Sequence, residues 1–228
     1  MTPIVLALTG LPGTGKTTLA DALYPLLAGF AFLDVDTLTI PLVRTALELR
    51  GLSLEAASSS GELRRLRDAQ YECLFAQTRQ LIGFGRDVLM VGPMTNELAD
   101  PPRFREVVSG FAPATMLLVR THAPGLVVCS RFEQRAGYMD RLRLKRWDLD
   151  AHRYNAPSPL PMPGLEVDTT SGTPLELARY VIAWVQRVAP QVAGEGADPV
   201  RASSGAKLTA AAAPRHEARS AIVSNREH

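Results

Sequence analysis

One short segment near the start of the chain combines the residue types and the spacing needed to bind phosphate groups. Residues 8–21 read LTGLPGTGKTTLAD, in which Gly10, Gly15, Lys16 and Thr17 fit the pattern G-x-x-x-x-G-K-[ST]. The glycines let backbone N–H groups approach phosphate oxygens, the lysine reaches the outer phosphates, and the hydroxyl binds Mg²⁺. The segment therefore predicts a nucleotide-binding loop, called the phosphate loop below. Its expected contact residues are Gly10, Leu11, Pro12, Gly13, Thr14, Gly15, Lys16, Thr17 and Thr18.

Two aspartates lie at the end of the next apolar run and are candidates for acid–base chemistry. The segment AFLDVDTL (31–38) reads as a strand that ends at acidic residues, Asp34 and Asp36. Alternate strand residues share a face, so both carboxylates are expected to point the same way, beside the phosphate loop. A carboxylate in that place can orient an acceptor hydroxyl and take its proton. The alternative for one of the two is the N-cap of the following helix.

Strand and helix patterns alternate along the chain and must place these residues together. Buried strands are expected at 4–8, 31–38, 87–92, 115–120 and 165–170, and helices at 16–28, 62–82, 129–154 and 174–188. This alternation predicts an α/β fold with a five-stranded parallel sheet and helices on both faces. The carboxyl ends of the strands then form one edge, where the candidate residues gather.

The composition is that of an ordinary globular protein and argues against several functional classes. A formal net charge of +2 over 228 residues predicts no large nucleic-acid or membrane-binding surface. Cys73 and Cys129 have no C-x-x-C partner, so we expect buried, reduced thiols rather than a disulfide framework or zinc site. No apolar stretch is long enough to span a bilayer, and no basic leader precedes the first strand, which indicates a cytoplasmic location.

The phosphate loop GLPGTGKTTLA, then LDVD, an arginine-rich segment and LEVDTT resemble the small P-loop kinases over residues 3–188. That superfamily includes gluconate kinase, shikimate kinase, chloramphenicol phosphotransferase and the polynucleotide kinase domains. The resemblance implies the three-layer P-loop NTPase fold, with ATP and Mg²⁺ as cofactors. It also implies a kinase domain over 1–189, with a helical lid and acceptor-site segments. The Ala-, Ser- and Gly-rich segment 190–228 is expected to be a disordered tail.

The resemblance also implies site residues. In similar kinases an aspartate at the end of the second strand contacts the acceptor alcohol, and Asp36 matches that position best. Such kinases carry lid arginines between the fourth strand and the last, where Arg131 and Arg135 are spaced to share one helical face. Arginines there stabilise the charge that develops in phosphoryl transfer. The remaining basic residues of this run, Arg141, Arg143, Lys145 and Arg146, are expected to form a solvated face.

The end of the third strand departs from the kinase pattern. Many relatives carry an aspartate there that supports Mg²⁺ through water, whereas this chain has Val91 and Gly92. We expect Thr17 and Asp34 to hold the metal instead, or Glu97 just downstream.

The acceptor pocket is expected between residues 37 and 82 and near 93–105, where the chain leaves the plain strand–helix rhythm. Similar kinases hold adenine against the loop after the last strand, which corresponds to residues 170–173. His122 and His152 fit no metal or triad spacing and are assigned no role. The side chains that could meet a polar acceptor are Arg44, Tyr71, Asn96 and Arg103.

The pattern as a whole favours an ATP-dependent phosphotransferase that acts on a hydroxyl group of a small molecule such as a sugar, a metabolite or an antibiotic. A nucleic-acid 5′-end kinase is an alternative that the near-neutral charge disfavours. A nucleotide-dependent regulatory binding module is the second alternative, because the third strand lacks its acid.

Overall fold

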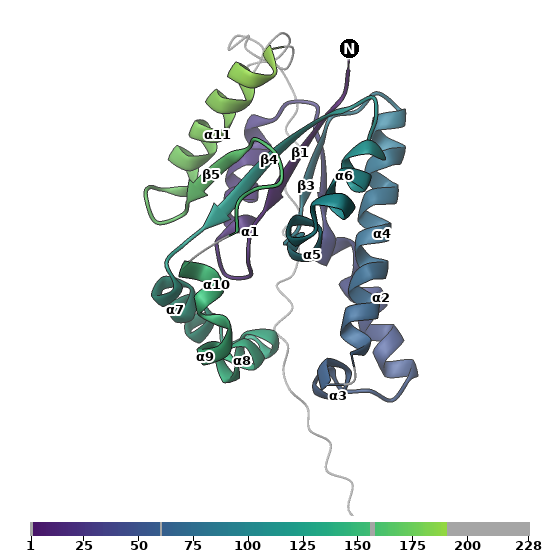
Figure 1. Cartoon of the computed structure of the whole chain (residues 1–228), viewed down its shortest axis with the longest axis vertical. Helices are drawn as coiled ribbons and strands as arrows, with labels where there is room; N and C mark the ends of the chain where they lie inside the picture. The colour runs from purple at the N-terminus through teal and green to yellow at the C-terminus, as the bar shows by residue number, and fades with distance from the viewer. Residues whose placement is uncertain (1, 60, 156–157, 191–228) are drawn as a thin grey trace, which may run out of the picture. The chain divides into compact units, whose positions relative to one another are not determined.

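The computed structural model describes residues 2–59, 61–155 and 158–190, and these form a parallel sheet with helices around it (Figure 1). The strands are β1 (Ile4–Thr9), β2 (Ala31–Asp34), β3 (Val88–Val91), β4 (Thr115–His122) and β5 (Leu165–Asp168). The first helices are α1 (Lys16–Leu23), the short 3₁₀ helix η1 (Tyr24–Leu26), α2 (Val35–Leu49), α3 (Leu54–Ser59), α4 (Glu62–Gly83), α5 (Thr95–Ala99) and α6 (Pro101–Ser109). They are followed by α7 (Gly125–Arg135), α8 (Tyr138–Lys145), α9 (Trp147–Asp150), α10 (His152–Asn155) and α11 (Pro174–Val188).

The five strands run parallel in the order β2-β3-β1-β4-β5, which confirms the expected α/β sheet. β1 lies at the centre and is buried along its whole length, as its continuous apolar sequence predicts. The register pairs Leu8 of β1 with Val91 of β3, and Val91 with Asp34 of β2. These three strands therefore end at one edge of the sheet, where the phosphate loop and the candidate acids begin.

Helices cover both faces of the sheet, as expected. On one face α1 and α11 pack against the strands around a core that includes Leu6, Leu19 and Val181. On the other face α4 and α6 pack around a core that includes Tyr71 and Phe104 (Figure 1). The two cores hold the sheet rigid, so that side chains at its carboxyl edge keep fixed positions.

The second strand is shorter than predicted. β2 ends at Asp34 and α2 starts at Val35, so Asp36 lies in the first turn of a helix. The cause is local, because the Asp34 carboxylate accepts a hydrogen bond from the N–H of Thr37 at 2.8 Å and caps the helix. The prediction that Asp34 and Asp36 share a strand face is therefore wrong, and the alternative of an N-cap holds for Asp34.

The arginine-rich segment is helical, as predicted, but it is divided into four short helices. Residues 125–155, called the lid below, contain α7 to α10. Ala136 has a φ of 48° and ends α7, so α8 continues in a new direction. Within the lid, the Trp147 ring packs against Phe132 and Tyr154, with ring-centroid distances of 6.0 and 5.3 Å. This small third core links the lid helices into one unit.

Three further expectations concern the surface and the end of the chain. Among the residues that the structure describes, no helix has the length and apolar character needed to cross a membrane. Cys73 is exposed and Cys129 is partly exposed, so the expectation of buried thiols is wrong. Apart from Pro190, the tail expected to be disordered lies outside the described residues.

Candidate active site

The phosphate loop joins β1 to α1 in a conformation that its glycines permit. Gly10 and Gly13 have φ values of 140° and 83°, which other residues rarely adopt. A Cβ atom at Gly10 would lie 2.4 Å from the carbonyl oxygen of Thr121, and one at Gly13 would lie 2.7 Å from Cγ1 of Val128. The loop leads into the N-terminus of α1, whose free amides and dipole favour an anion. Its backbone is therefore suited to bind phosphate.

Lys16 is the first residue of α1, and its ammonium group lies inside the phosphate loop. Nζ donates hydrogen bonds to the carbonyl oxygens of Gly10 at 2.8 Å and Leu11 at 2.9 Å. Burial lowers the pKa of Lys16 to about 8; the Asp36 carboxylate opposes this effect, and the Arg143 guanidinium adds to it. Asp36 and Arg143 therefore lie close enough to Lys16 to act on its charge.

The two aspartates have different surroundings. Asp34 is the N-cap of α2, where one carboxylate oxygen is used by a backbone N–H. Asp36 is exposed to solvent on one side. Its pKa is nevertheless raised, mainly by partial removal from water and secondly by repulsion from the Asp34 carboxylate. Lys16 and Arg143 oppose that rise. Asp36 is thus the carboxylate whose pKa is tuned at the phosphate loop.

The two lid arginines predicted from the sequence both lie on α7 but have different partners. Arg131 donates from Nη1 to the carbonyl oxygen of Gly13 and to Oγ1 of Thr169, each at 3.1 Å. It therefore joins the phosphate loop to the β5–α11 connection. Arg135 instead forms an ion pair with Asp140 at 2.9 Å.

Arg143 is a site residue that the sequence did not reveal. Its Nη1 donates to the Asp140 carboxylate at 3.2 Å, and its guanidinium lies 5.6 Å from the ring centroid of Phe132. Its charge also acts on the pKa values of Lys16 and Asp36. The expectation of a solvated face is wrong for this residue, because the turn between α7 and α8 brings it back toward the phosphate loop.

A cavity of about 410 Å³ opens between the phosphate loop, α7 and the start of α11, and is called the α7–α11 cavity. Arg131 and Arg135 both line it, which confirms that they share a face of their helix. Gly172, which lies within the segment 170–173 where the sequence places adenine, lines it too, as does Pro174. Its volume lies within the range of small-ligand sites. The residues present therefore fit a nucleoside whose phosphates lie on the loop.

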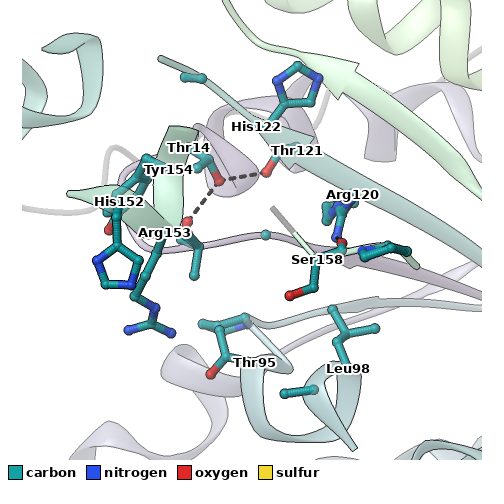
Figure 2. Close-up of a pocket in the computed structure, with 16 residues that line it drawn as sticks. Thr14, Thr95, Leu98, Arg120, Thr121, His122, His152, Arg153, Tyr154 and Ser158 are labelled. Carbon is teal, nitrogen blue, oxygen red and sulfur yellow. Dashed lines mark hydrogen bonds between the residues drawn. The ribbon is translucent and has the colours of Figure 1, made fainter. Parts of the chain in front are cut away.

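A second cavity, of about 290 Å³, lies between the phosphate loop, α5, the end of β4 and α10, and is called the α5–α10 cavity. Figure 2 shows Thr14 and Thr121, hydrogen-bonded at 2.8 Å, across the cavity from Thr95 and Leu98 of α5. Among the described residues that line it there is no carboxylate. His122 and His152, to which the sequence assigns no role, line this cavity together with Arg120, Arg153 and Tyr154.

The hydroxyl group of Tyr154 ties the lid to the phosphate loop. It donates a hydrogen bond to the carbonyl oxygen of Pro12 at 3.1 Å. The Tyr154 ring stacks on Trp147, with a centroid distance of 5.3 Å. The lid therefore reaches the loop both through Arg131 and through Tyr154.

The four side chains expected to meet an acceptor line neither of the two cavities. Tyr71 is a core residue whose hydroxyl oxygen accepts a hydrogen bond from the N–H of Met94 at 2.6 Å. Arg103 lies near the carboxylates of Glu97 and Asp68. Thr95 and Leu98, which fall within the segment 93–105 where the acceptor is expected, line the α5–α10 cavity instead.

Glu97 is fully buried and belongs to an ion-pair cluster. Its carboxylate accepts two hydrogen bonds from Arg67, at 2.9 and 3.3 Å, and lies 3.5 Å from Arg103. The Arg67 guanidinium also lies 4.2 Å from the ring centroid of Tyr71. The alternative that Glu97 supports a metal is thus wrong, because its charge is already neutralised away from water.

Replacing Glu97 with Gln should therefore destabilise the fold. A buried ion pair that loses one partner leaves an uncompensated charge, so we expect the free energy of unfolding to fall by about 3 kcal/mol. Urea unfolding followed by circular dichroism measures this change. Glu106→Gln is the matched control, since Glu106 is exposed on α6 and its loss should change stability by no more than about 0.5 kcal/mol. Equal losses in the two variants would contradict a stabilising role for the cluster.

The missing acid at the end of β3 has a packing explanation. A Cβ atom at Gly92 would lie 3.2 Å from the Tyr71 hydroxyl oxygen and 3.2 Å from Cγ1 of Val35. A carboxylate at this position would not fit without moving both side chains. Within the described residues, no three His, Cys, Asp or Glu side chains form a metal cluster. Mg²⁺ needs no such cluster, because it is held by one or two protein oxygens together with substrate phosphates and water.

Comparison with known proteins gives the family. The family model described as chloramphenicol phosphotransferase-like protein matches residues 3–186. The chain belongs to the chloramphenicol phosphotransferase-like family. It is a P-loop kinase, a phosphotransferase with an alcohol group as acceptor, as the sequence predicted. No curated protein matches the chain.

Solved structures share the fold of this chloramphenicol phosphotransferase-like protein. A candidate kinase from Chloroflexus aurantiacus is 25% identical, with a TM-score of 0.60 over 82% of this chain and 97% of that chain. A sugar kinase from a Janibacter species is 21% identical, with a TM-score of 0.56 over 84% and 98%. A gluconokinase from Sinorhizobium meliloti is 18% identical, with a TM-score of 0.51 over 84% and 96%.

Proposed function

We propose that the protein transfers the γ-phosphoryl group of ATP to a hydroxyl group of a small molecule such as a sugar, another metabolite or an antibiotic. The observation that best supports this is the meeting of three charges at the phosphate loop. The ammonium of Lys16, the carboxylate of Asp36 and the guanidinium of Arg143 each act on the pKa of a neighbour. A phosphate-binding cation, a proton acceptor and a second cation that stabilises the developing charge are the groups that phosphoryl transfer requires.

In this proposal ATP occupies the phosphate loop and the α7–α11 cavity. The loop amides and Lys16 hold the β- and γ-phosphates, and Arg131 closes the nucleoside side of the loop through Gly13 and Thr169. Arg135 lines the same cavity and can reach the phosphates. Arg131 and Arg135 thus remain the proposed lid arginines, with Arg131 nearer the nucleoside.

Asp36 is the proposed general base. It accepts the proton of the acceptor hydroxyl while the oxygen forms its bond to the γ-phosphorus and the bond to the ADP oxygen breaks. A raised pKa makes Asp36 a better proton acceptor than an ordinary carboxylate. The proton then passes to solvent, because one side of Asp36 is exposed.

Mg²⁺ bound with ATP would neutralise the phosphate oxygens. The Thr17 hydroxyl, at the second position of α1, and the Asp34 carboxylate are the proposed protein ligands. One carboxylate oxygen of Asp34 already accepts the capping hydrogen bond of α2. We therefore expect Asp34 to bind Mg²⁺ through its other oxygen or through a water molecule.

The acceptor is proposed to enter the α5–α10 cavity. Gly10 and Leu11 form part of its wall, and their carbonyl oxygens are the ones that hold Lys16. Asp36 is not among the described residues that line this cavity, so the proposal requires the acceptor to extend from the cavity mouth and bring its reacting hydroxyl group to the Asp36 carboxylate. The volume of the cavity suits a small molecule, and its threonine hydroxyls and histidines can hydrogen-bond a polar one.

A panel of alcohols tests the proposal. The protein is incubated with Mg-ATP and sugars, sugar acids, polyols or hydroxyl-bearing antibiotics, and the products are followed by ³¹P NMR and mass spectrometry. We expect one chemical class to give a phosphate monoester and ADP in equal amounts, because each turnover moves one phosphoryl group.

The panel also includes a 5′-hydroxyl oligonucleotide, which separates the alternatives. Phosphorylation of the oligonucleotide alone would favour an end kinase. ADP formation that is slow and independent of every alcohol would favour a regulatory nucleotide-binding module. Either result would overturn the proposed small-molecule kinase.

A further inference from the structure

Asp140 lies at the junction of two lid helices, where it is buried and interacts with two arginines. It is 8% exposed, and it occupies the first turn of α8, where the helix dipole favours a carboxylate. A Cβ atom at Gly137 would lie 3.0 Å from its Oδ2, so this oxygen faces the preceding backbone. The carboxylate is therefore fixed between α7 and α8.

The other oxygen of Asp140 holds two arginines at once. Oδ1 accepts from Nη2 of Arg135 at 2.9 Å and from Nη1 of Arg143 at 3.2 Å. Both guanidinium groups also lie over the ring of Phe132, at 5.3 and 5.6 Å from its centroid. Two cations that share one acceptor oxygen repel each other, and the negative charge of the shared carboxylate offsets that repulsion. The group of three keeps one net positive charge.

Arg135 and Arg143 lie on different helices, but both side chains lie near the phosphate loop. Arg135 lines the α7–α11 cavity, while the charge of Arg143 acts on both Lys16 and Asp36. Both side chains are partly open, with 53% and 35% of their side-chain area exposed, so each can contact a ligand. The pair thus spans the region between the nucleoside side of the loop and the proposed base.

We infer that Asp140 is a positioning residue that holds Arg135 and Arg143 together as a clamp for the terminal phosphate of the nucleotide. The inference rests on the proposed function for the identity of that ligand. Fixing both arginines before binding saves the entropy of ordering two long side chains, and a small displacement of such groups is costly for catalysis. Asp140 itself contacts no substrate.

The test compares Mg-ATP with Mg-ADP, which differ by the phosphate that the clamp would hold. Calorimetry on Asp140→Asn is expected to show affinity for Mg-ATP lowered roughly 10- to 100-fold, with affinity for Mg-ADP within about twofold of the unaltered protein. Asp140→Glu should recover part of the loss, because it keeps the charge. Asp148→Asn is the matched control: Asp148 is exposed on α9, and its replacement should change neither affinity.

A double-mutant cycle shows whether Asp140 acts through the arginines. In a background of Arg135→Gln with Arg143→Gln, Asp140→Asn should produce no further loss of Mg-ATP affinity. An equal loss for both nucleotides would mean that Asp140 only supports the fold of the lid, and no loss for either would mean that it has no part in binding; each result overturns the inference. If Asp140→Asn lowers the affinity for Mg-ATP but not for Mg-ADP, and no alcohol is phosphorylated, the role of Asp140 is supported and the proposed kinase activity is wrong.

Discussion

Asp36→Asn is expected to lower kcat for phosphoryl transfer roughly 10³-fold, while the dissociation constant for Mg-ATP stays within a few-fold of the unaltered value. Asparagine keeps the shape of the side chain in the first turn of α2 but cannot accept the proton of the acceptor hydroxyl. The pKa of Asp36 is raised by partial desolvation and by Asp34, which marks it as the tuned carboxylate of the site. Steady-state kinetics with the alcohol found in the panel, together with calorimetry for Mg-ATP, measure the two quantities.

The control for Asp36 is Asp21→Asn, because Asp21 is an exposed aspartate on α1, the helix that follows the phosphate loop. This variant should retain both kcat and nucleotide affinity. If Asp36→Asn turns over the alcohol as fast as the unaltered protein, the assignment of Asp36 as the general base is wrong. A loss of nucleotide affinity equal to the loss of kcat would instead assign Asp36 to nucleotide binding.

Lys16→Ala should lower kcat/KM for Mg-ATP by about three orders of magnitude, because it removes the cation proposed to bind the outer phosphates. The ammonium is already held inside the loop by the carbonyl oxygens of Gly10 and Leu11, so it needs little rearrangement to meet a phosphate. Lys16→Met keeps most of the side-chain volume without the charge and should lose nearly as much. Mg-nucleotide uptake that is unaffected by either change would refute the nucleotide site itself.

The same lysine provides a proton signature. Because burial lowers the pKa of Lys16 to about 8, part of the protein carries a neutral amine at pH 8. A polyphosphate favours the charged form, so its binding raises this pKa and takes up protons near pH 8, and affinity falls as the pH rises further. Calorimetry in two buffers of different ionisation enthalpy measures that uptake, and Lys16→Met should abolish it.

The sheet and the phosphate loop could be predicted because their signals are local. The apolar run of β1, the glycine spacing and Lys16 depend on neighbours within about ten residues. The end of β2 was predicted less well, since Asp36 and its neighbours continue an alternating pattern. The hydrogen bond from the Thr37 N–H to the Asp34 carboxylate caps the helix, so the chain becomes helical at Val35 although the alternating pattern continues.

The lid shows where sequence reasoning stops. The i, i+4 spacing of Arg131 and Arg135 correctly places them on one face, but it does not reveal that Arg131 binds Gly13 and Thr169. Arg143 looks like one member of a charged run, although it lies one helical turn from Asp140 on α8, and the turn after Ala136 brings both of them to Arg135 of α7. The histidines of the α5–α10 cavity have no spacing signal at all, because β4 and α10 meet only in the folded chain.

The two cavities beside the phosphate loop have one consequence for how this enzyme can change. Gly13, Gly15 and Thr18 face one cavity and Gly10, Leu11 and Thr14 face the other, so no residue belongs to both walls. Mutations in α5 or α10 can therefore reshape one compartment while the opposite compartment keeps its full set of contacts. With the acceptor and the phosphate donor in the cavities proposed above, such a scaffold can acquire new acceptors in evolution while its contacts with the donor stay unchanged.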